Sequence, residues 1–254
     1  MDTKNKIALI TGGSRGIGRS AAIHMAQKGL DVIITYNNNK QAADEVVSEI
    51  HSIGRKAAAL QLDTRNVKSF DSFFGQLEDC LRNEMGGPKF DFLINNAGTA
   101  LYSLISDTTE EQLDAVYHIH FKGVYLLIQK ALKLLNDGGG IVNVSSGLTR
   151  FSNPGSSGYA SMKGAVEVLT RYMAKELGPR RIRANAVAPG AIATDFGGGR
   201  TRDNAEINKH IADVTALGRA GLPDDVGGVI AFLCTDEAKW INGQRIEVSG
   251  GMNL

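Results

Sequence analysis

Short apolar runs alternate with longer, more polar stretches along most of the chain. Seven runs rich in Val, Ile, Leu and Ala are mostly continuous rather than alternating, which predicts strands covered on both faces. These predicted strands span residues 6–11, 32–36, 57–62, 90–95, 140–145, 181–188 and 244–248. The segments between them are long enough for crossover helices, so the pattern predicts an α/β fold with a doubly wound parallel sheet of about seven strands.

The whole chain, residues 1–254, is predicted to form one domain. No linker rich in Pro, Gly and Ser divides it, and a sheet of this size can bury a core on both faces. In such folds, ligands bind beyond the carboxyl ends of the strands. The substrate pocket is therefore expected in the loops at that edge, chiefly residues 190–218. Candidate lining residues are Tyr102, Leu104, Phe151, Asn153 and residues 195–214.

Charge and cysteine content limit which binding partners and which cellular compartment we expect for this protein. The 28 basic and 27 acidic residues are scattered and leave a net charge of +1, so we expect neither nucleic acid nor an anionic membrane as a partner. Cys80 and Cys234 are far apart and lack metal-site spacing, which predicts no disulfide and no metal and fits a reducing cytoplasm. The sequence has no apolar run of about 18 residues. We therefore expect a cytoplasmic protein, without targeting or membrane segments, that acts on a small molecule.

A glycine-rich turn follows the first predicted strand. The sequence Thr11-Gly12-Gly13-Ser14-Arg15-Gly16-Ile17-Gly18 leads directly into a helical pattern. Glycines let the backbone turn tightly and approach a pyrophosphate, and the following helix offers free N–H groups and the positive end of its dipole. The strand before and the helix after indicate a dinucleotide-binding loop of the Rossmann type. Its candidate contacts are Gly12, Ser14, Arg15, Gly16, Ile17 and Gly18.

The end of the second predicted strand bears on the choice of cofactor. In NAD-binding sites an acidic residue there accepts hydrogen bonds from the ribose and repels a 2′-phosphate. Here the strand ends in Tyr36 and Asn37, followed by two more asparagines and no carboxylate. Arg15 is able to pair with a 2′-phosphate, so the sequence favours NADP(H) over NAD(H). The alternative is that Arg15 is a solvated loop charge, since no second arginine stands near Asn37.

Further motifs, taken with this loop, resemble the short-chain dehydrogenase/reductase family. They are Asn95-Asn96-Ala97-Gly98, Ser145-Ser146, Tyr159-Ala160-Ser161-Met162-Lys163, Pro189-Gly190, Gly218-Arg219-Ala220-Gly221 with Pro223, Asn242-Gly243-Gln244 and Gly250-Gly251. The match spans nearly the whole chain. It implies a Rossmann-fold oxidoreductase that moves a hydride between NADP(H) and a carbonyl or secondary alcohol substrate.

The resemblance gives catalytic roles to three side chains. Tyr159 and Lys163 stand four residues apart in a helical stretch and share one face. A free tyrosine, with a pKa of about 10, is a poor base at neutral pH, but a nearby ammonium lowers that pKa. The pair would exchange a proton with the substrate oxygen, while Ser146 holds that oxygen and stabilises its charge. The adjacent Ser145 is not the matching position.

Other cofactor contacts also come from the resemblance. Asn96 is expected to support the ribose region, and Asp63 to lie near the adenine. Ile192 and Thr194 are expected to cover the nicotinamide carboxamide, and Lys163 to bond the nicotinamide ribose. Beyond the glycine-rich loop, the expected contacts are Tyr36, Asn37, Asp63, Asn96, Ala97, Gly98, Tyr159, Lys163, Pro189, Gly190, Ile192 and Thr194.

One position departs from the family pattern. Where the family usually has an asparagine whose backbone carbonyl holds a water in the proton relay, this chain has His120, in the run Ile119-His120-Phe121-Lys122-Gly123. Either only the backbone at residue 120 matters, or the imidazole joins the relay behind Lys163. In the second case, burial and the Lys163 ammonium would both lower the pKa of His120.

The leading interpretation is an NADP(H)-dependent carbonyl reductase or alcohol dehydrogenase, and two alternatives stay open. The same residues would serve a 3-oxoacyl-thioester reductase or a sugar dehydrogenase. A protein of a different class, a dinucleotide sensor without turnover, would keep the fold and the cofactor site. The resemblance also implies a homotetramer, with a dimer as the alternative.

Overall fold

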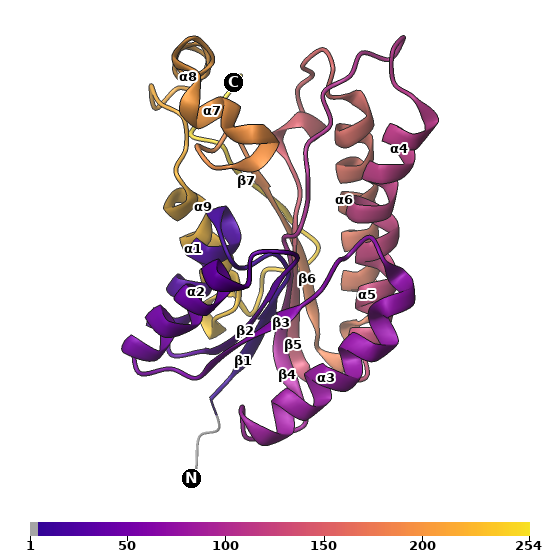
Figure 1. Cartoon of the computed structure of the whole chain (residues 1–254), viewed down its shortest axis with the longest axis vertical. Helices are drawn as coiled ribbons and strands as arrows, with labels where there is room; N and C mark the ends of the chain where they lie inside the picture. Colours follow the sequence, from indigo (N-terminus) through magenta and orange to yellow (C-terminus); the bar gives the residue numbers. More distant parts are fainter. Residues whose placement is uncertain (1–4) are drawn as a thin grey trace.

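Seven parallel strands form the centre of the structure, a computed structural model that describes residues 5–254. Their order across the sheet is β3-β2-β1-β4-β5-β6-β7, and each neighbouring pair is parallel. The chain starts in the middle, winds to one edge, returns beside β1 and winds to the other edge (Figure 1). The strands are β1 (Ile7–Ile10), β2 (Asp31–Tyr36), β3 (Ala57–Gln61), β4 (Phe90–Asn95), β5 (Leu135–Val144), β6 (Arg183–Pro189) and β7 (Arg245–Val248). The prediction of a doubly wound α/β fold is confirmed.

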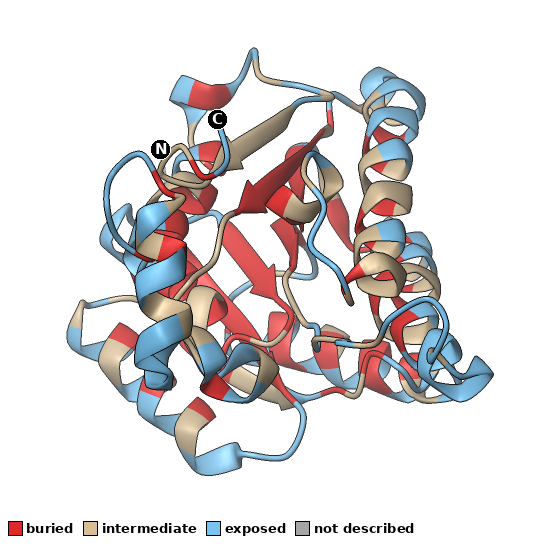
Figure 2. Ribbon diagram, turned by 90° about the horizontal axis from the view of Figure 1, so that it is seen from above, coloured by how far each residue is buried: buried red, intermediate tan, exposed pale blue. Residues whose placement is uncertain are grey.

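Helices cover both faces of this sheet, which is why its strands are apolar throughout. One face packs against α1 (Gly16–Gln27), α2 (Lys40–Ser52) and α9 (Pro223–Leu233). The other packs against α3 (Phe70–Asn83), α5 (Gly123–Ala131) and α6 (Ser157–Glu176). Viewed from above, the strands are buried and the outer faces of the helices are exposed (Figure 2). Short 3₁₀ turns are η1 (Val67–Ser69), η3 (Gly147–Thr149), η4 (Gly178–Arg180), η5 (Phe196–Gly199) and η6 (Asp236–Ala238).

The predicted strand boundaries hold to within about two residues, except at β5. That strand begins at Leu135, five residues before the predicted start at residue 140. Its first part contains Asn136-Asp137-Gly138-Gly139, a composition that indicates a turn. The pairing with β4 shifts register here, since Leu135 pairs with Phe90 whereas Gly140 pairs with Phe92. The irregularity accommodates the polar residues inside the strand.

A long rod beside the sheet is interrupted by a wide turn. It consists of α4 (Glu110–Tyr117), a π-helical turn η2 (His118–Lys122) and α5. The amide of Gly123 donates to the His118 carbonyl, five residues back. A Cβ on Gly123 would lie 2.2 Å from the Thr64 carbonyl oxygen, so the rod passes close to the loop after β3. Such turns change the direction in which side chains point, and here His120 becomes fully buried.

Residues 195–214, termed the cover segment, lie over the carboxyl ends of the strands together with the end of the chain (Figure 1). The segment contains η5, α7 (Arg200–Asp203) and α8 (Ala205–Asp213). Gly197, Gly198 and Gly199 are all left-handed, with φ of 63°, 75° and 75°, a conformation that glycine adopts at little cost. Thr215 pairs with Met252, which brings the C-terminal residues beside the segment. Within residues 5–254, no helix is both long and apolar enough to span a membrane.

Candidate active site

A cavity of about 970 Å³ opens at the carboxyl ends of the strands. Segments that follow all seven strands contribute its walls, the cover segment among them. The cavity therefore lies at the edge where the fold predicts a ligand. It includes Tyr102, Phe151 and Asn153 from the predicted substrate region, but Leu104 does not line it.

The glycine-rich loop after β1 is packed too tightly for side chains. A Cβ on Gly18 would lie 2.2 Å from the Gly12 carbonyl oxygen, and one on Gly13 would lie 2.6 Å from the Ile34 side chain. Gly12 and Gly16 have left-handed φ values of 67° and 54°. Gly18 is buried under the loop and does not line the cavity, and its contact with the cofactor stays a prediction. Its role is to let the helix approach the loop backbone.

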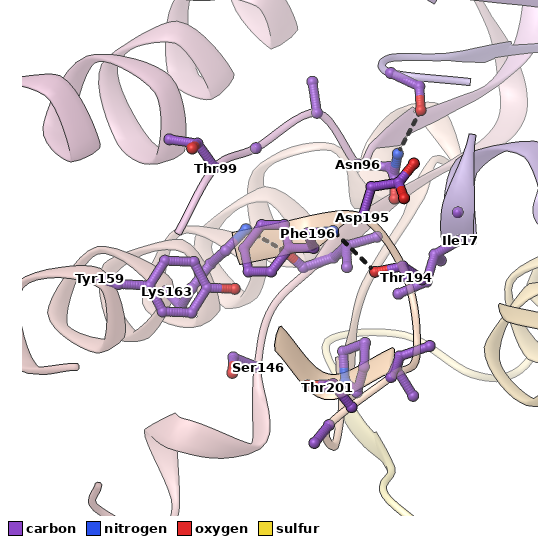
Figure 3. A pocket seen from close by; sticks show the side chains of 18 of the residues that line it. Ile17, Asn96, Thr99, Ser146, Tyr159, Lys163, Thr194, Asp195, Phe196 and Thr201 are labelled. Atoms are coloured by element: carbon purple, nitrogen blue, oxygen red, sulfur yellow. Dashed lines mark hydrogen bonds between the residues drawn. The ribbon is translucent and has the colours of Figure 1, made fainter. Parts of the chain in front are cut away.

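The same loop leaves backbone donors for an anion. Helix α1 has no side-chain cap at its N-terminus, which leaves its first amide groups unsatisfied by the chain. Asn96 donates its side-chain amide to the Thr11 and Gly12 carbonyls at 3.0 and 2.9 Å, and this brace is visible in Figure 3. Asn96 therefore holds the shape of the loop. A pyrophosphate fits this cradle, because uncapped N–H groups and the positive end of a helix dipole face it.

Two arginines line the cavity, Arg15 in the glycine-rich loop and Arg65 in the loop after β3. Arg65 binds Asp63 at 2.8 Å and lowers the pKa of that carboxyl group through a hydrogen bond. Arg15 lies 3.6 Å from Asp195 of the cover segment, and most of its side chain is exposed. Asn37 lines the cavity, and its carbonyl accepts a hydrogen bond from Gln61 at 2.8 Å. Arg15, the cation of the glycine-rich loop, is thus held loosely by one exposed carboxylate.

The two serines after β5 have different surroundings. The Ser145 hydroxyl donates to Glu167 at 2.6 Å. The Ser146 oxygen accepts from the Leu148 amide at 3.2 Å, caps η3 and lines the cavity. This leaves the Ser146 proton available to a ligand, whereas the Ser145 proton is engaged. The family resemblance favours Ser146 over Ser145, and this assignment stays a prediction.

Tyr159 and Lys163 lie on the cavity side of α6, but their electrostatics differ from expectation. The Lys163 ammonium donates to the Val144 carbonyl at 2.7 Å and lies 5.7 Å from the centre of the Tyr159 ring. Burial raises the pKa of Tyr159 well above its usual value, and the Ser146 hydroxyl opposes this only in part. Burial also lowers the pKa of Lys163 to about 8. The net fall that we expected in the pKa of Tyr159 does not occur, because desolvation of the phenol outweighs the favourable effect of a nearby ammonium.

His120 packs against the tyrosine. The two rings are perpendicular with centroids 5.0 Å apart. Nε2 lies 2.7 Å from the Thr99 carbonyl oxygen, and because a carbonyl only accepts, this contact places the proton on Nε2. Nδ1 is buried and has no partner among residues 5–254. Burial and then Lys163 hold the pKa of His120 well below its usual value, so the ring is neutral at physiological pH.

Sequence reasoning missed an ionic network behind Ser146. Glu167 lies one helical turn beyond Lys163 and accepts from Ser145, Thr149 and Arg245 at 2.6, 2.8 and 2.8 Å. Arg245 also donates to the Ser146 carbonyl at 3.3 Å. The network thus ties the Ser146 turn to α6 and β7. The one signal in the sequence is that Glu167 extends the helical face of Tyr159 and Lys163.

Apart from Gly18, every residue expected to bind the cofactor lines the cavity, as do Ser146 and His120. The C-terminal residues Met252 and Asn253 also line it and were not expected there. Arg150 holds their carbonyls at 2.7 and 3.0 Å. The Gly250-Gly251 turn, with both residues left-handed, returns the chain to the site.

Comparisons of sequence and structure match this chain to known dehydrogenases and reductases. A family profile described as enoyl-(acyl carrier protein) reductase matches residues 12–253. The short chain dehydrogenase mdpC of Emericella nidulans is 35% identical over 258 residues, covering 98% of this chain and 95% of that protein. The promiscuous reductase LugOII, which catalyses keto-reduction at C1 during lugdunomycin biosynthesis, is 40% identical with a TM-score of 0.93 over 100% of both chains. The landomycin C-6 ketoreductase LanV, solved with NADP and rabelomycin, is 34% identical with a TM-score of 0.89 over 98% and 96% of the chains.

Proposed function

We propose that this chain, which belongs to the short-chain dehydrogenase/reductase family, is an NADP(H)-dependent ketoreductase acting on a small carbonyl compound or the matching secondary alcohol. The observation that carries this proposal is the convergence of Ser146, Tyr159 and Lys163 on one cavity with the glycine-rich loop. LugOII and LanV, two structural relatives, are both named for keto-reduction.

Each member of the trio has a role that fits its surroundings. The bound nicotinamide supplies the hydride. Tyr159 gives its phenolic proton to the carbonyl oxygen, and a raised pKa suits this role because it keeps the phenol protonated at neutral pH. Ser146 donates a hydrogen bond to the same oxygen as it gains charge. Lys163, buried beside the ring, favours the phenolate that remains after transfer.

His120 acts as a neutral positioning residue in this proposal. Its perpendicular contact fixes the Tyr159 ring, and its Nε2–H fixes the Thr99 carbonyl in the loop after β4. The depressed pKa argues against an imidazolium in the proton path. The unpartnered Nδ1 suits an acceptor for a buried water, which is how such atoms are usually satisfied.

We propose NADP(H) as the preferred cofactor. Arg15 is the cation of the glycine-rich loop, and its contact with Asp195 at 3.6 Å is long enough to be exchanged for a phosphate. The end of β2 carries no carboxylate that would repel this group. Arg65 is already committed to Asp63. LanV was solved with NADP bound.

Reduction of a 3-oxoacyl thioester is the second candidate, because the matching family profile is described as an enoyl-(acyl carrier protein) reductase, a name that implies a related carrier-bound thioester substrate. A panel of ketones, aldehydes, sugars and acetoacetyl-coenzyme A, assayed by loss of NADPH absorbance, separates the candidates. We expect aryl ketones to be reduced faster than the thioester and the sugars. Tyr159→Phe should lower turnover by roughly a hundredfold or more while NADPH binding, measured by fluorescence, stays intact. A Tyr159→Phe variant with most of the parent activity would exclude the proposed proton donor.

We also propose that the protein forms a homotetramer or a dimer. Tyr117, Tyr125, Val168 and Tyr172 are exposed apolar side chains on the rod α4–η2–α5 and on α6. An apolar face of this kind is typical of a subunit contact. Light scattering tests the assembly, and Tyr125→Glu with Tyr172→Glu should shift the mass towards the monomer. A parent protein that is monomeric at all concentrations contradicts the proposal.

A further inference from the structure

Beyond Tyr159, the cavity continues into a region with mostly apolar walls, termed the substrate hollow. It is formed by Tyr102, Phe151, Phe196, Ile207, Val214 and Met252. Four of these residues pack in one hydrophobic cluster of the cover segment and the C-terminal residues. Tyr102 and Phe196 are 52% and 41% exposed, and exposed aromatic side chains that share a pocket wall mark a surface that a ligand covers.

Aromatic rings of the substrate hollow lie next to the reacting groups. The Phe196 and Tyr159 rings have centroids 5.9 Å apart, and Figure 3 shows Phe196 beside Tyr159 with Thr201 on the Ser146 side. Tyr102 is close enough for its hydroxyl to contribute to the raised pKa of Tyr159. An apolar body therefore fits beside these rings with its carbonyl at Tyr159 and Ser146.

One cation borders this region without a partner. The Arg200 guanidinium lies over the Tyr102 ring, 4.6 Å from its centre, and lines the cavity. Among residues 5–254, no carboxylate lies within ion-pair distance of it. Arg202, two residues further on, is held by both Asp195 and Asp203. Carboxylates of the cover segment thus neutralise Arg202, whereas Arg200, on the cavity wall, remains available to a ligand.

The other charges of the cavity do not offset Arg200. Its carboxylates are Asp63 and Asp195, and each already accepts from an arginine. The ring of Tyr102 holds Arg200 through its π face and leaves the N–H groups at the edge of the guanidinium free. Those groups match the two oxygens of a carboxylate or a phosphate.

We propose that Arg200 is an anion-recognition residue, and that the substrate is a ketone with an apolar body and an anionic group at the end remote from the carbonyl. This inference rests on the proposed ketone reduction and specifies its substrate. Tyr159 and Ser146 bind the carbonyl, the aromatic walls bind the body, and Arg200 binds the anion. The anion is either a carboxylate of a free molecule or a phosphate of a carrier-bound thioester.

Paired ligands test the inference. A tetralone carboxylate and its neutral carboxamide share one flat body and differ in charge, and acetoacetyl-coenzyme A supplies the phosphate alternative. The parent, Arg200→Gln and Arg200→Lys are compared with Lys209→Gln, which removes a charge from α8 outside the cavity. The readouts are kcat/KM with NADPH and calorimetric binding to the protein with NADP⁺.

We expect Arg200→Gln to weaken binding of the tetralone carboxylate about ten- to a hundredfold, the range for a charge-assisted hydrogen bond. The carboxamide should change by less than about twofold, since it offers Arg200 no charge. Arg200→Lys should recover part of the loss, and Lys209→Gln should match the parent. If only acetoacetyl-coenzyme A responds to Arg200→Gln, the anion is the phosphate of a thioester.

Two failures are distinguishable. Equal binding of carboxylate and carboxamide by the parent, with the carboxamide still reduced, overturns the anion site and leaves ketone reduction standing. Conversely, the carboxylate can bind in an Arg200-dependent way while no ketone oxidises NADPH. That result overturns the proposed ketone reduction and leaves the anion site standing. If Lys209→Gln weakens binding as much as Arg200→Gln does, the effect comes from general surface charge and the inference is wrong.

Discussion

Removal of the Glu167 carboxylate should both destabilise the fold and slow catalysis. One of its oxygens accepts from Ser145, Thr149 and Arg245 at 2.6, 2.8 and 2.8 Å. Glu167→Ala deletes all of these contacts and leaves the two hydroxyls and the guanidinium short of a partner. Glu167→Gln keeps an acceptor oxygen and removes only the charge.

The expected loss of stability follows from the burial of the Glu167–Arg245 ion pair. Breaking a buried ion pair costs about 3–5 kcal/mol, and the side chains of Glu167 and Arg245 are 12% and 25% exposed. The lower end, about 3 kcal/mol, therefore applies to Glu167→Ala. At roughly 2–4 °C per kcal/mol for a domain of this size, Tm should fall by about 6–12 °C. Because Arg245 also holds the Ser146 carbonyl, kcat should fall about tenfold, the scale expected when a catalytic group is displaced by less than about 1 Å.

Thermal unfolding by circular dichroism and steady-state kinetics provide the readouts. The matched control is Asp44→Ala, which removes the exposed pair of Asp44 with Lys40 on α2 and should cost less than about 0.5 kcal/mol. A cycle with Arg245→Met should give a coupling of about 1–2 kcal/mol. If Glu167→Ala melts within the range of the control and the cycle shows no coupling, the network does not position Ser146.

Four other variants test the site and its surroundings. Ser146→Ala should lower kcat about ten- to a hundredfold without changing NADPH affinity in a fluorescence titration; a weaker Kd with normal kcat would contradict its assigned role. Arg15→Ala should weaken NADPH about tenfold or more and leave NADH unchanged, and tighter NADH binding by the parent would show that NADP(H) is not preferred. His120→Asn should keep activity with a pH profile that superimposes on the parent's between about pH 6 and 7.5; an ionisation seen only in the parent would restore the relay hypothesis. The pKa of His120 is depressed in the folded protein, whereas in the unfolded chain the imidazole has its ordinary pKa of about 6.5. Below that pH the unfolded state therefore binds more protons than the folded state, so acidification should destabilise the parent more than His120→Asn. Gly98→Ala places a Cβ 2.6 Å from the His120 ring and should cost about 1–3 kcal/mol in denaturant unfolding, whereas an unchanged midpoint would mean that the ring moves freely.

The fold, and the edge of the sheet at which the motifs meet, were predictable because both follow from local sequence patterns. Continuous apolar runs indicate strands of a sheet covered on both faces. Since parallel strands end at one edge, the loop at Gly12, the turn at Ser146 and the segment after Pro189 had to meet there. The helical spacing of Tyr159 and Lys163 placed both side chains on one face.

Other features depend on contacts that no local pattern encodes. Glu167 meets Arg245 across 78 residues of chain, and Arg150 meets Glu247 across 97. The pKa of Tyr159 was expected to fall, because spacing reveals the neighbouring ammonium but not the extent of burial. In the glycine-rich loop, the motif does not tell which glycine packs against the backbone, as Gly18 does.

The anchoring of the last residues has a practical consequence for handling the protein. Met252 and Asn253 are part of the cavity wall, and Arg150 grips their carbonyls, while Leu254 is 94% exposed. Carboxypeptidase trimming by three residues would remove a wall of the site rather than a loose tail, and the enzyme should lose substrate affinity before it loses its fold. An affinity tag fused after Leu254 would leave from the rim of the site, so N-terminal fusions are the safer format for kinetic work.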